Sequence, residues 1–542
     1  MAGETAGYFV RRATGLVRAW SGFDAFIYAF FSVNFVTLGM YIMSFGPFVP
    51  KGHLLPAAII TGVLVTFLVI VYAGLIAAMP RAGGDYVWQS RILGGGIAFV
   101  LAVTGWWFIL WHWVPIYGNI LSIQFFAPIL STLGRPAAAQ WFGTPTGIFL
   151  SSLVVLAFVA YYIAIGMEGY ARIQKACFWG GLVGLAIVFL LLLVGSQAQF
   201  QQAFNREAVS LFGASGDVYA QTLEASRKYG FTPGAFGSMP LGPSILLIPM
   251  LVFYLLWPNW GATLYGEVRG ASDYRRVFSG MFWGLWVTVA LSVVFFLLVA
   301  KTMGWDFYLA ANSNYWATIY DPKNAPALAV PLWPYPAMLA TWLVNNRAFQ
   351  LIVLLLMSLW FWGWSGTVFL SSTRVIFAAA FDRVLPEWAA SVSPKSHVPT
   401  GALVLMVVPS IVVSYLYAYR PGFATLTLDA TLVIAVTYLG SVFAATIFPW
   451  RRSQLYESSP VARYKVAGLP LISVAGVITI AFLLFNLWKW VTDATYGVNN
   501  RQSGVYMLVL YALALVIYII ARVVRARQGI DLARIHSEIP VE

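Results

Sequence analysis

The sequence predicts an all-α polytopic membrane protein, one that crosses a lipid bilayer many times. Of its 542 residues, 60% are hydrophobic and only 9% are charged, and the mean hydropathy is +0.79. A soluble protein has no interior large enough to bury that proportion of apolar side chains. Apolar runs of about 18 residues or more, the length that crosses the hydrocarbon core as a helix, recur along the whole chain.

We predict twelve spans, taken in order along the chain. Their approximate limits are 23–44, 55–79, 96–121, 146–166, 176–194, 241–266, 278–300, 348–380, 400–418, 426–448, 469–490 and 505–522. The loop at 195–240 is expected to carry short structure of its own. An even number of spans places both ends of the chain on the same side of the membrane.

The basic residues predict the orientation. The formal net charge is +13, and 20 of the 32 Lys and Arg residues fall in the segments that are cytoplasmic if the N-terminus is cytoplasmic. Because positive residues accumulate on that side, both termini are expected in the cytoplasm, and the charge gives no reason to expect a nucleic acid partner. Residues 1–20 lack the apolar core of a signal peptide. The single cysteine, Cys177, excludes an internal disulfide.

This pattern divides the chain into four segments. They are a cytoplasmic N-terminal segment at 1–22, a core of spans one to nine at 23–418, spans ten to twelve at 419–523, and a cytoplasmic tail at 524–542.

The sixth predicted span is interrupted near its middle. Pro258 has no backbone N–H and its ring clashes with the preceding turn, so the helix should open near Trp257. Asn259 and the permissive Gly261 follow directly. Unpaired backbone groups are tolerated in a bilayer only where protein or a polar cavity covers them, so this break is a candidate binding site. A proline kink absorbed by neighbouring helices is the structural alternative.

The first span is interrupted at a similar depth. Ser32 and Asn34 break an aromatic run that begins after Asp24. At ~1.5 Å per residue, Asn34 lies about 15 Å from Asp24, and Asn259 lies about 12 Å from Glu267, in a core ~30 Å thick. Two interrupted spans, five apart and crossing in opposite directions, are the pattern expected of an inverted repeat of five spans plus five.

Spans three and eight supply further candidates. The third span contains Trp111 and His112, and this histidine can either bind a coupled proton or hydrogen-bond to a neighbouring helix as a neutral ring. In span eight, Thr367 and Ser371 share one helix face, where hydroxyls can bind Na⁺ or a neighbouring carbonyl. The sequence leaves both choices open.

The connection after span two reads PRAGGDY. Pro80 ends one helix, two glycines supply a turn, and Asp85 is expected to cap the next helix in a cytoplasmic connection. We find no Asp or Glu deep inside a predicted span.

Three motifs, in this order, resemble the amino acid–polyamine–organocation (APC) permeases. They are PRAGGDY after span two, the broken sixth span ending in GEVRG, and SSTRVIFAAAFDRVLPEW closing span eight. GLVRAWSGFDAF before span one is similar to the same region of prokaryotic members, and the resemblance covers roughly residues 15–400. It implies a LeuT-like 5+5 inverted repeat followed by two helices, with spans one and six broken. It also implies a secondary active transporter that moves amino acids across the cytoplasmic membrane by alternating access.

Carried over position by position, the resemblance implies a set of substrate contacts in spans one, three and six. They are Ser32, Val33, Asn34, Phe35, Trp111, Trp257, Pro258, Asn259, Trp260 and Gly261. Freed N–H groups at the start of a half-helix can hold a carboxylate, and freed carbonyls can hold an ammonium group. This chain departs from relatives by lacking a glycine-rich break in span one and by having Pro258 where they often have glycine.

No cofactor is expected, and the coupling ion stays open. His112 favours H⁺, Thr367 with Ser371 favours Na⁺, and an exchanger needs neither. Since no acid lies deep in a predicted span, a neutral amino acid is the expected substrate, and the lipid bilayer is the expected surrounding. The sequence does not predict the oligomeric state.

Three other classes of protein are alternatives. A nucleobase or other organocation symporter on the same fold would stack a flat ring on Trp260 or Trp111. A membrane-embedded enzyme would need clustered catalytic or metal-binding residues, and the four histidines are scattered, so no catalytic or metal site is predicted. A channel would more often show a repeated filter loop, and none is found in the sequence.

Overall fold

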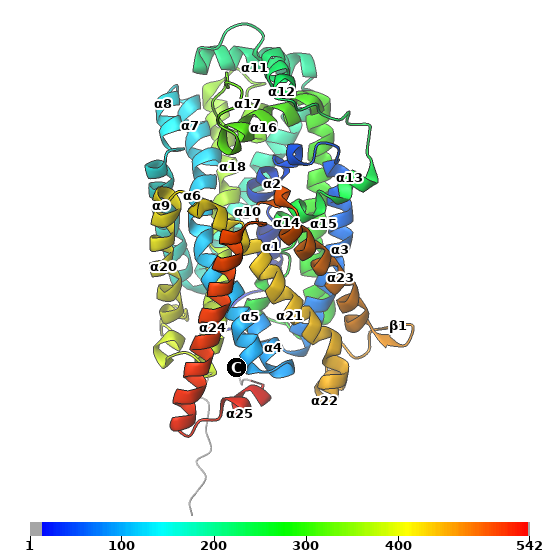
Figure 1. Cartoon of the computed structure of the whole chain (residues 1–542), viewed down its shortest axis with the longest axis vertical. Helices are drawn as coiled ribbons and strands as arrows, with labels where there is room; N and C mark the ends of the chain where they lie inside the picture. Colours follow the sequence, from blue (N-terminus) through cyan, green and yellow to red (C-terminus); the bar gives the residue numbers. More distant parts are fainter. Residues whose placement is uncertain (1–13, 540–542) are drawn as a thin grey trace, which may run out of the picture.

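Apolar helices dominate the computed structural model, which describes residues 14–539. Residues 1–13 of the predicted N-terminal segment, including Arg11 and Arg12, and residues 540–542 of the predicted tail lie outside the described residues. Within the described part, eleven helical stretches are long and apolar enough to cross a membrane. Most of them stand roughly upright in Figure 1, which confirms the all-α polytopic class.

The spanning stretches consist of the following helices. They are α1 (Gly22–Val33), η1 (Phe35–Gly39) and α2 (Met40–Met43); α3 (Leu54–Ala78); α5 (Gly95–Val103), η3 (Thr104–Phe108), η4 (Ile109–His112), α6 (Trp113–Leu121), η5 (Ser122–Phe126) and α7 (Ala127–Thr132); α9 (Pro145–Ala164); α10 (Gly166–Val194); α15 (Tyr274–Val299), η7 (Ala300–Gly304) and α16 (Trp305–Tyr320); α18 (Arg347–Ser365) and α19 (Thr367–Phe381); α20 (Thr400–Tyr419); η9 (Phe423–Thr427) and α21 (Asp429–Arg451); α23 (Leu471–Thr492); and α24 (Arg501–Arg527).

The sixth predicted span is absent from these eleven because it is divided. It consists of α13 (Leu241–Ile245), α14 (Ile248–Leu255) and the 3₁₀ segment η6 (Trp260–Glu267). None of these is long enough alone to cross the hydrocarbon core. The break expected at Pro258 falls between α14 and η6.

Short elements cover the two ends of the bundle (Figure 1). One end, which we call the loop end, carries α11 (Gln197–Phe212), α12 (Val218–Lys228) and α17 (Pro336–Thr341). The opposite end, which we call the terminal end, carries α4 (Gly84–Ile92), α22 (Ser453–Glu457) and α25 (Leu532–Ser537). The remaining short elements are η2 (Gly46–Phe48), α8 (Pro136–Trp141), η8 (Glu387–Ala390), η10 (Ala494–Tyr496) and the antiparallel hairpin of β1 (Lys465–Val466) and β2 (Leu469–Pro470).

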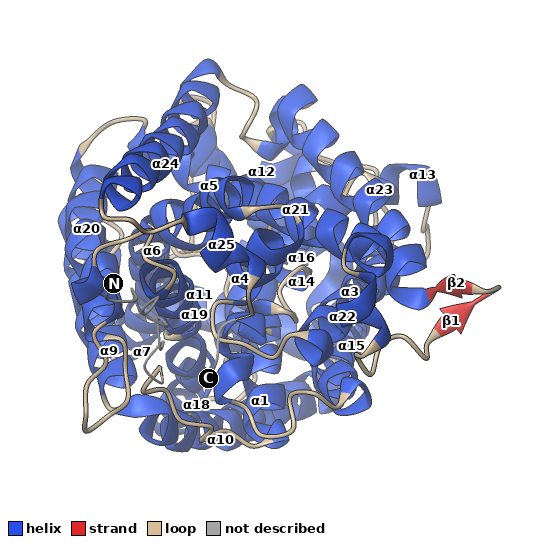
Figure 2. Cartoon of the chain, turned by 90° about the horizontal axis from the view of Figure 1, so that it is seen from below, coloured by secondary structure: helices blue, strands red, loops and turns tan. Residues whose placement is uncertain are grey.

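Burial separates the inner helices from the outer ones. In the first span, 89% of the most apolar stretch is buried, whereas in α24 only 17% is. Figure 2 shows α24 on the rim of the bundle. Exposed Leu508, Val509 and Leu513 therefore suit contact with lipid tails. The first span instead packs against α15, α10 and α18.

Two fully buried ion pairs join helices at the terminal end. The Arg374 guanidinium donates to both carboxylate oxygens of Glu267, at 2.7 and 3.0 Å. Arg91 does the same to Asp382, at 2.5 and 2.9 Å. Arg374, on α19, is therefore paired with an acid inside the bundle and does not extend to the surface. Bidentate geometry offsets much of the cost of removing such charges from water.

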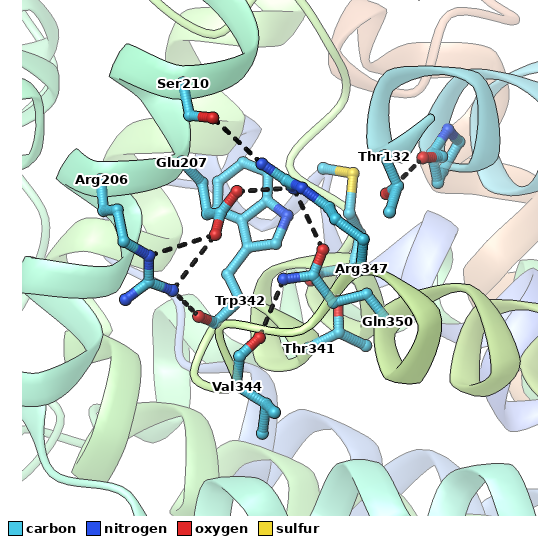
Figure 3. Close-up of polar contacts among 11 residues, drawn as sticks. Thr132, Arg206, Glu207, Ser210, Thr341, Trp342, Val344, Arg347 and Gln350 are labelled. Atoms are coloured by element: carbon cyan, nitrogen blue, oxygen red, sulfur yellow. Dashed lines mark hydrogen bonds and ion pairs between the residues drawn. The ribbon is translucent and has the colours of Figure 1, made fainter. Parts of the chain in front are cut away.

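A third ion cluster fastens the loop end (Figure 3). The Glu207 carboxylate on α11 is buried between Arg206, at 3.1 Å, and Arg347 at the start of α18, at 2.6 Å. Arg206 also donates to the Trp342 carbonyl, and Arg347 donates to the Ser210 hydroxyl. The loop at 195–240 is therefore structured, as predicted, and α11 is tied to span eight.

Replacing Glu207 by Gln should destabilise the protein, because two arginines lose their common counter-charge. The arginine side chains are 38% and 37% exposed, so the expected loss is on the order of 2 kcal/mol, below the ~3–5 kcal/mol typical of a fully buried pair. Thermal unfolding in detergent measures it. Glu224→Gln, which breaks the exposed pair with Lys228, is the control, and equal effects of the two changes would contradict the buried role of Glu207.

Candidate functional site

The two broken spans run side by side in opposite directions. A Cβ atom placed on Gly261 would lie 3.1 Å from the Tyr28 ring, and one placed on Gly39 would lie 3.2 Å from the Tyr254 ring. Outside these helices, the segments before α1 and after η6 meet in a parallel backbone bridge between Trp20 and Val268. As residue numbers rise in one span they fall in the other, so the two breaks face each other at the same level.

Asn34 forms the break in the first span. Its backbone is left-handed, at φ +32°, a conformation that asparagine adopts more readily than most residues. Its side-chain oxygen accepts a hydrogen bond from the Thr37 N–H at 2.8 Å, and its amide nitrogen donates to the Trp360 carbonyl at 3.1 Å. Asn34 therefore supports the broken backbone and ties it to α18.

The neighbours of Asn34 in the first span are also buried. The Ser32 hydroxyl donates to the Tyr28 carbonyl, one turn earlier, at 2.7 Å. Val33 and Phe35 are fully buried, and the Phe35 ring meets the Phe295 ring edge to face, with 5.7 Å between centroids.

Asn259 occupies the break in the sixth span. The turn around it is closed by two backbone bonds, from the Trp260 N–H to the Trp257 carbonyl at 3.0 Å and from the Ala262 N–H to the Asn259 carbonyl at 2.8 Å. The Asn259 side chain is fully buried, yet among the described residues neither its amide nitrogen nor its oxygen has a hydrogen-bond partner. Buried polar groups are nearly always paired, so this amide is available to a ligand.

Four aromatic rings contact one another at this break, and we call them the aromatic cage: Trp106, Trp257, Trp260 and Tyr438. The Trp260 ring lies 4.5 Å from Trp106 and 5.2 Å from Trp257, between centroids. Tyr438 on α21 lies 6.1 Å from Trp257, and its hydroxyl is next to the Asn259 amide without a well-formed hydrogen bond. Trp106 and Tyr438 were not predicted, because nothing in their local sequence separates them from other span aromatics.

The remaining polar candidates join the broken spans to span eight. The Tyr28 hydroxyl donates to the Thr367 carbonyl at 2.6 Å and contacts the Ser371 hydroxyl at 2.7 Å. Ser371 donates to the Trp260 carbonyl at 2.9 Å, and the Trp260 indole donates to the Thr367 carbonyl at 3.2 Å. The Thr367 hydroxyl itself donates to the Trp364 carbonyl at 2.8 Å. Both predicted Na⁺ ligands are thus engaged in protein hydrogen bonds.

Trp111 and His112 contact other helices. The Trp111 indole donates to the Leu405 carbonyl on α20 at 3.2 Å. The His112 Nε2 atom lies 2.6 Å from the Tyr506 hydroxyl on α24, and its ring stacks on Phe423. Of the two roles that the sequence left open for His112, these contacts favour the structural one.

The expectation that Asp85 caps the helix of this connection is wrong. Gly83, at φ +97°, precedes α4 without a side-chain cap, and its N–H donates to the Thr263 carbonyl, which draws the chain inward. Asp85 is fully buried. Its carboxylate accepts hydrogen bonds from the Tyr72 hydroxyl at 2.5 Å, the Ser441 hydroxyl at 2.5 Å and the Trp106 indole at 3.1 Å. The sequence analysis missed the burial of Asp85 because α4 is short and polar, which is typical of an exposed helix.

With this geometry established, comparison with known proteins identifies the family. A family model described as "Amino acid permease" matches residues 26–521, most of the chain. The chain belongs to the amino acid permease family. This permease is therefore a transporter in the APC superfamily and not an enzyme, which confirms the resemblance drawn from its motifs. A search of the curated proteins found no match.

Replacing Asn34 by Ala should destabilise this permease by about 2 kcal/mol, since it removes a cap and places a Cβ residue without local hydrogen bonds at positive φ. Asn34→Gly removes the same hydrogen bonds but tolerates the backbone, so it should cost less. Thermal unfolding of both variants checks the order. A glycine variant as unstable as the alanine variant would show that backbone strain contributes nothing.

Replacing His112 by Gln should cost about 1 kcal/mol through the weakened contact with Tyr506, and it should leave the pH dependence of uptake unchanged. Uptake measured across a pH series in proteoliposomes checks this. A flattened pH profile would assign the coupled proton to His112 instead.

Proposed function

We propose that this permease is a secondary active transporter of neutral amino acids in the cytoplasmic membrane, working by alternating access. The broken segment at 241–267 counts as a twelfth span, in a LeuT-like 5+5 inverted repeat with two further helices. The antiparallel contact of the two broken spans supports that arrangement. With both termini cytoplasmic, the terminal end faces the cytoplasm.

The unpartnered amide of Asn259 carries the proposal. It offers both a donor and an acceptor at a break in the backbone, at the point where two spans meet. An amino acid carries a carboxylate and an ammonium group on one carbon, and so it can satisfy both atoms while helix ends at the breaks stabilise its charges. Burial without a protein partner is unfavourable, so a ligand that supplies partners binds with a corresponding gain.

The aromatic cage supports an apolar or aromatic side chain as the substrate's variable part. Its three indoles and one phenol carry no formal charge, and the Asp85 carboxylate beside the cage is already hydrogen-bonded to the Trp106 indole and to the Tyr72 and Ser441 hydroxyls. A cationic side chain would find no counter-charge among the cage residues themselves, and burying a lone cation is costly. The same rings can stack on a nucleobase, which makes that class the main competitor in a ligand screen.

A thermal-shift screen of the purified permease tests the substrate class. The panel holds the twenty amino acids, polyamines and nucleobases, each with and without Na⁺. A ligand at about 100 times its Kd stabilises the folded state by about 2.7 kcal/mol, so a substrate should stand out. We expect a neutral apolar or aromatic amino acid. A response only to nucleobases would overturn the substrate class, and a response that needs Na⁺ would favour the Na⁺ role of Thr367 and Ser371.

Replacing Asn259 by Ala should abolish the ligand-induced shift and the uptake, while the protein stays folded and inserted. Asn486→Ala is the matched control, because Asn486 is an equally buried asparagine whose amide donates within its own helix, to the Phe482 carbonyl at 2.7 Å. Normal transport kinetics in the Asn259 variant would remove this residue from the site.

A further inference from the structure

We propose that Asp85 binds the proton whose movement drives transport through this permease. The inference rests on the proposed transport function and adds the coupling ion and its site. The carboxylate gains a proton from water on one side of the membrane and releases it to water on the other, and no electrons move.

The first argument is a comparison of the buried acids. Among the described residues, six carboxylates are buried, namely Asp24, Asp85, Glu207, Glu267, Asp382 and Asp429. Four of them have a cationic partner: Lys175 for Asp24, Arg206 and Arg347 for Glu207, Arg374 for Glu267, and Arg91 for Asp382. Within residues 14–539, Asp85 and Asp429 form no ion pair with a basic side chain.

A buried carboxylate without a counter-ion is costly when ionised, and binding a proton removes that cost. Burial raises the pKa of Asp85 to about 6. Its partners also suit both protonation states. The Tyr72 and Ser441 hydroxyls donate to a carboxylate, and each can turn to accept from the protonated acid, which an arginine cannot do.

The charged groups around Asp85 do not supply it with a counter-ion. The elements packed against α4 carry these titratable or charged side chains: Asp429, Tyr438 and Arg451 of α21, Tyr265 and Glu267 of η6, Arg374 of α19, and Arg534 and His536 of α25, with Tyr86 and Arg91 on α4 itself. Tyr72 of α3 and Asp382 after α19 also bond to side chains of α4. Glu267 and Arg374 neutralise each other, as do Asp382 and Arg91. His536 lies within 3.1 Å of the Tyr86 hydroxyl and 3.9 Å of Asp382.

The second argument is that Asp85 is joined to the substrate site. Its Oδ2 atom accepts from the Trp106 indole, whose ring lies 4.5 Å from Trp260, the residue that follows Asn259. A substrate in the aromatic cage therefore packs against a ring held by Asp85, so proton binding and substrate binding influence each other. Asp429 lacks this connection, since it lies twelve residues before Ser441 on α21, about 18 Å along the helix.

A cleft at the terminal end lies next to the residues that contact Asp85. This cleft, of about 890 Å³, is lined by Ser90 and Arg91 of α4. The neighbouring Gln89 amide donates to the Ser441 hydroxyl at 2.8 Å, and Ser441 in turn contacts Asp85. A water chain formed from this cleft along α4 would reach the carboxyl group.

The test uses the full-length permease in proteoliposomes, with the amino acid that gives the largest thermal shift. Two assays are compared: accumulation driven by a pH gradient, with about pH 5.5 outside and about pH 7.5 inside on either side of the carboxyl pKa, and counterflow without a gradient. We expect Asp85→Asn to abolish gradient-driven accumulation and to retain counterflow, because a permanently neutral side chain permits exchange but carries no proton. Asp429→Asn, the other buried acid without an ion pair, should accumulate substrate as the unmodified protein does.

The outcomes separate the two proposals. Counterflow without gradient-driven accumulation in the unmodified protein would overturn proton coupling and leave the transport function standing. Undiminished accumulation by Asp85→Asn, or its loss in Asp429→Asn instead, would overturn the assignment to Asp85. An unmodified protein that moves no member of the panel would overturn the proposed function and this inference with it.

A folding defect in Asp85→Asn is handled by a second variant. Should counterflow also be lost, Asp85→Glu decides, because it keeps an ionisable carboxyl group. The proposal requires gradient-driven accumulation to return with a shifted dependence on outside pH. Counterflow without that return would overturn it.

Discussion

The requirement that every backbone polar group inside a bilayer find a partner governs this structure. Two spans are broken, and each break persists because side chains supply the missing bonds. Asn34 bonds to both its own chain and α18, and the Tyr28, Trp260 and Ser371 side chains bind backbone carbonyls of spans six and eight. The polar groups that nonetheless lack partners, above all the Asn259 amide, mark where something other than protein is needed.

The same requirement for a partner governs the buried charges. Bidentate arginine–carboxylate pairs join helices at the terminal end, where neither partner reaches water. Each pair resists separation more strongly than a surface pair, because a lone charge would remain in a low-dielectric interior. Asp85 has hydroxyl and indole partners instead, within the same end of the bundle. The arginine–carboxylate pairs hold helices together, whereas the Asp85 carboxyl group can gain or lose a proton.

Composition and span length were enough to predict the helical membrane class, and Pro258 was enough to locate the second break. The sequence could not show which residues contact one another across the helix bundle. Asn34 was correctly placed at a break, but its bond to Trp360 depends on a helix 326 residues away. Asp85 was misjudged because its surroundings come from three other spans, and Tyr438 because a tyrosine in an apolar helix has no distinguishing neighbour. Only eleven of the twelve predicted spans form helical stretches long enough to cross a membrane, because the segment containing Pro258 forms only short helices.

The docking of α25 on α4 has a consequence for the order in which the protein assembles during synthesis. Arg91 on α4 donates to the Glu538 carbonyl, and the Tyr86 hydroxyl contacts His536 on α25. These contacts join residues about 450 positions apart, so they form only after α25 has been synthesised and has left the ribosome. Earlier spans insert into the membrane as they leave the ribosome, whereas the contacts of α25 with α4 at the terminal end form last. The newly inserted permease therefore passes through a stage in which its terminal end is incomplete, until α25 has docked on α4.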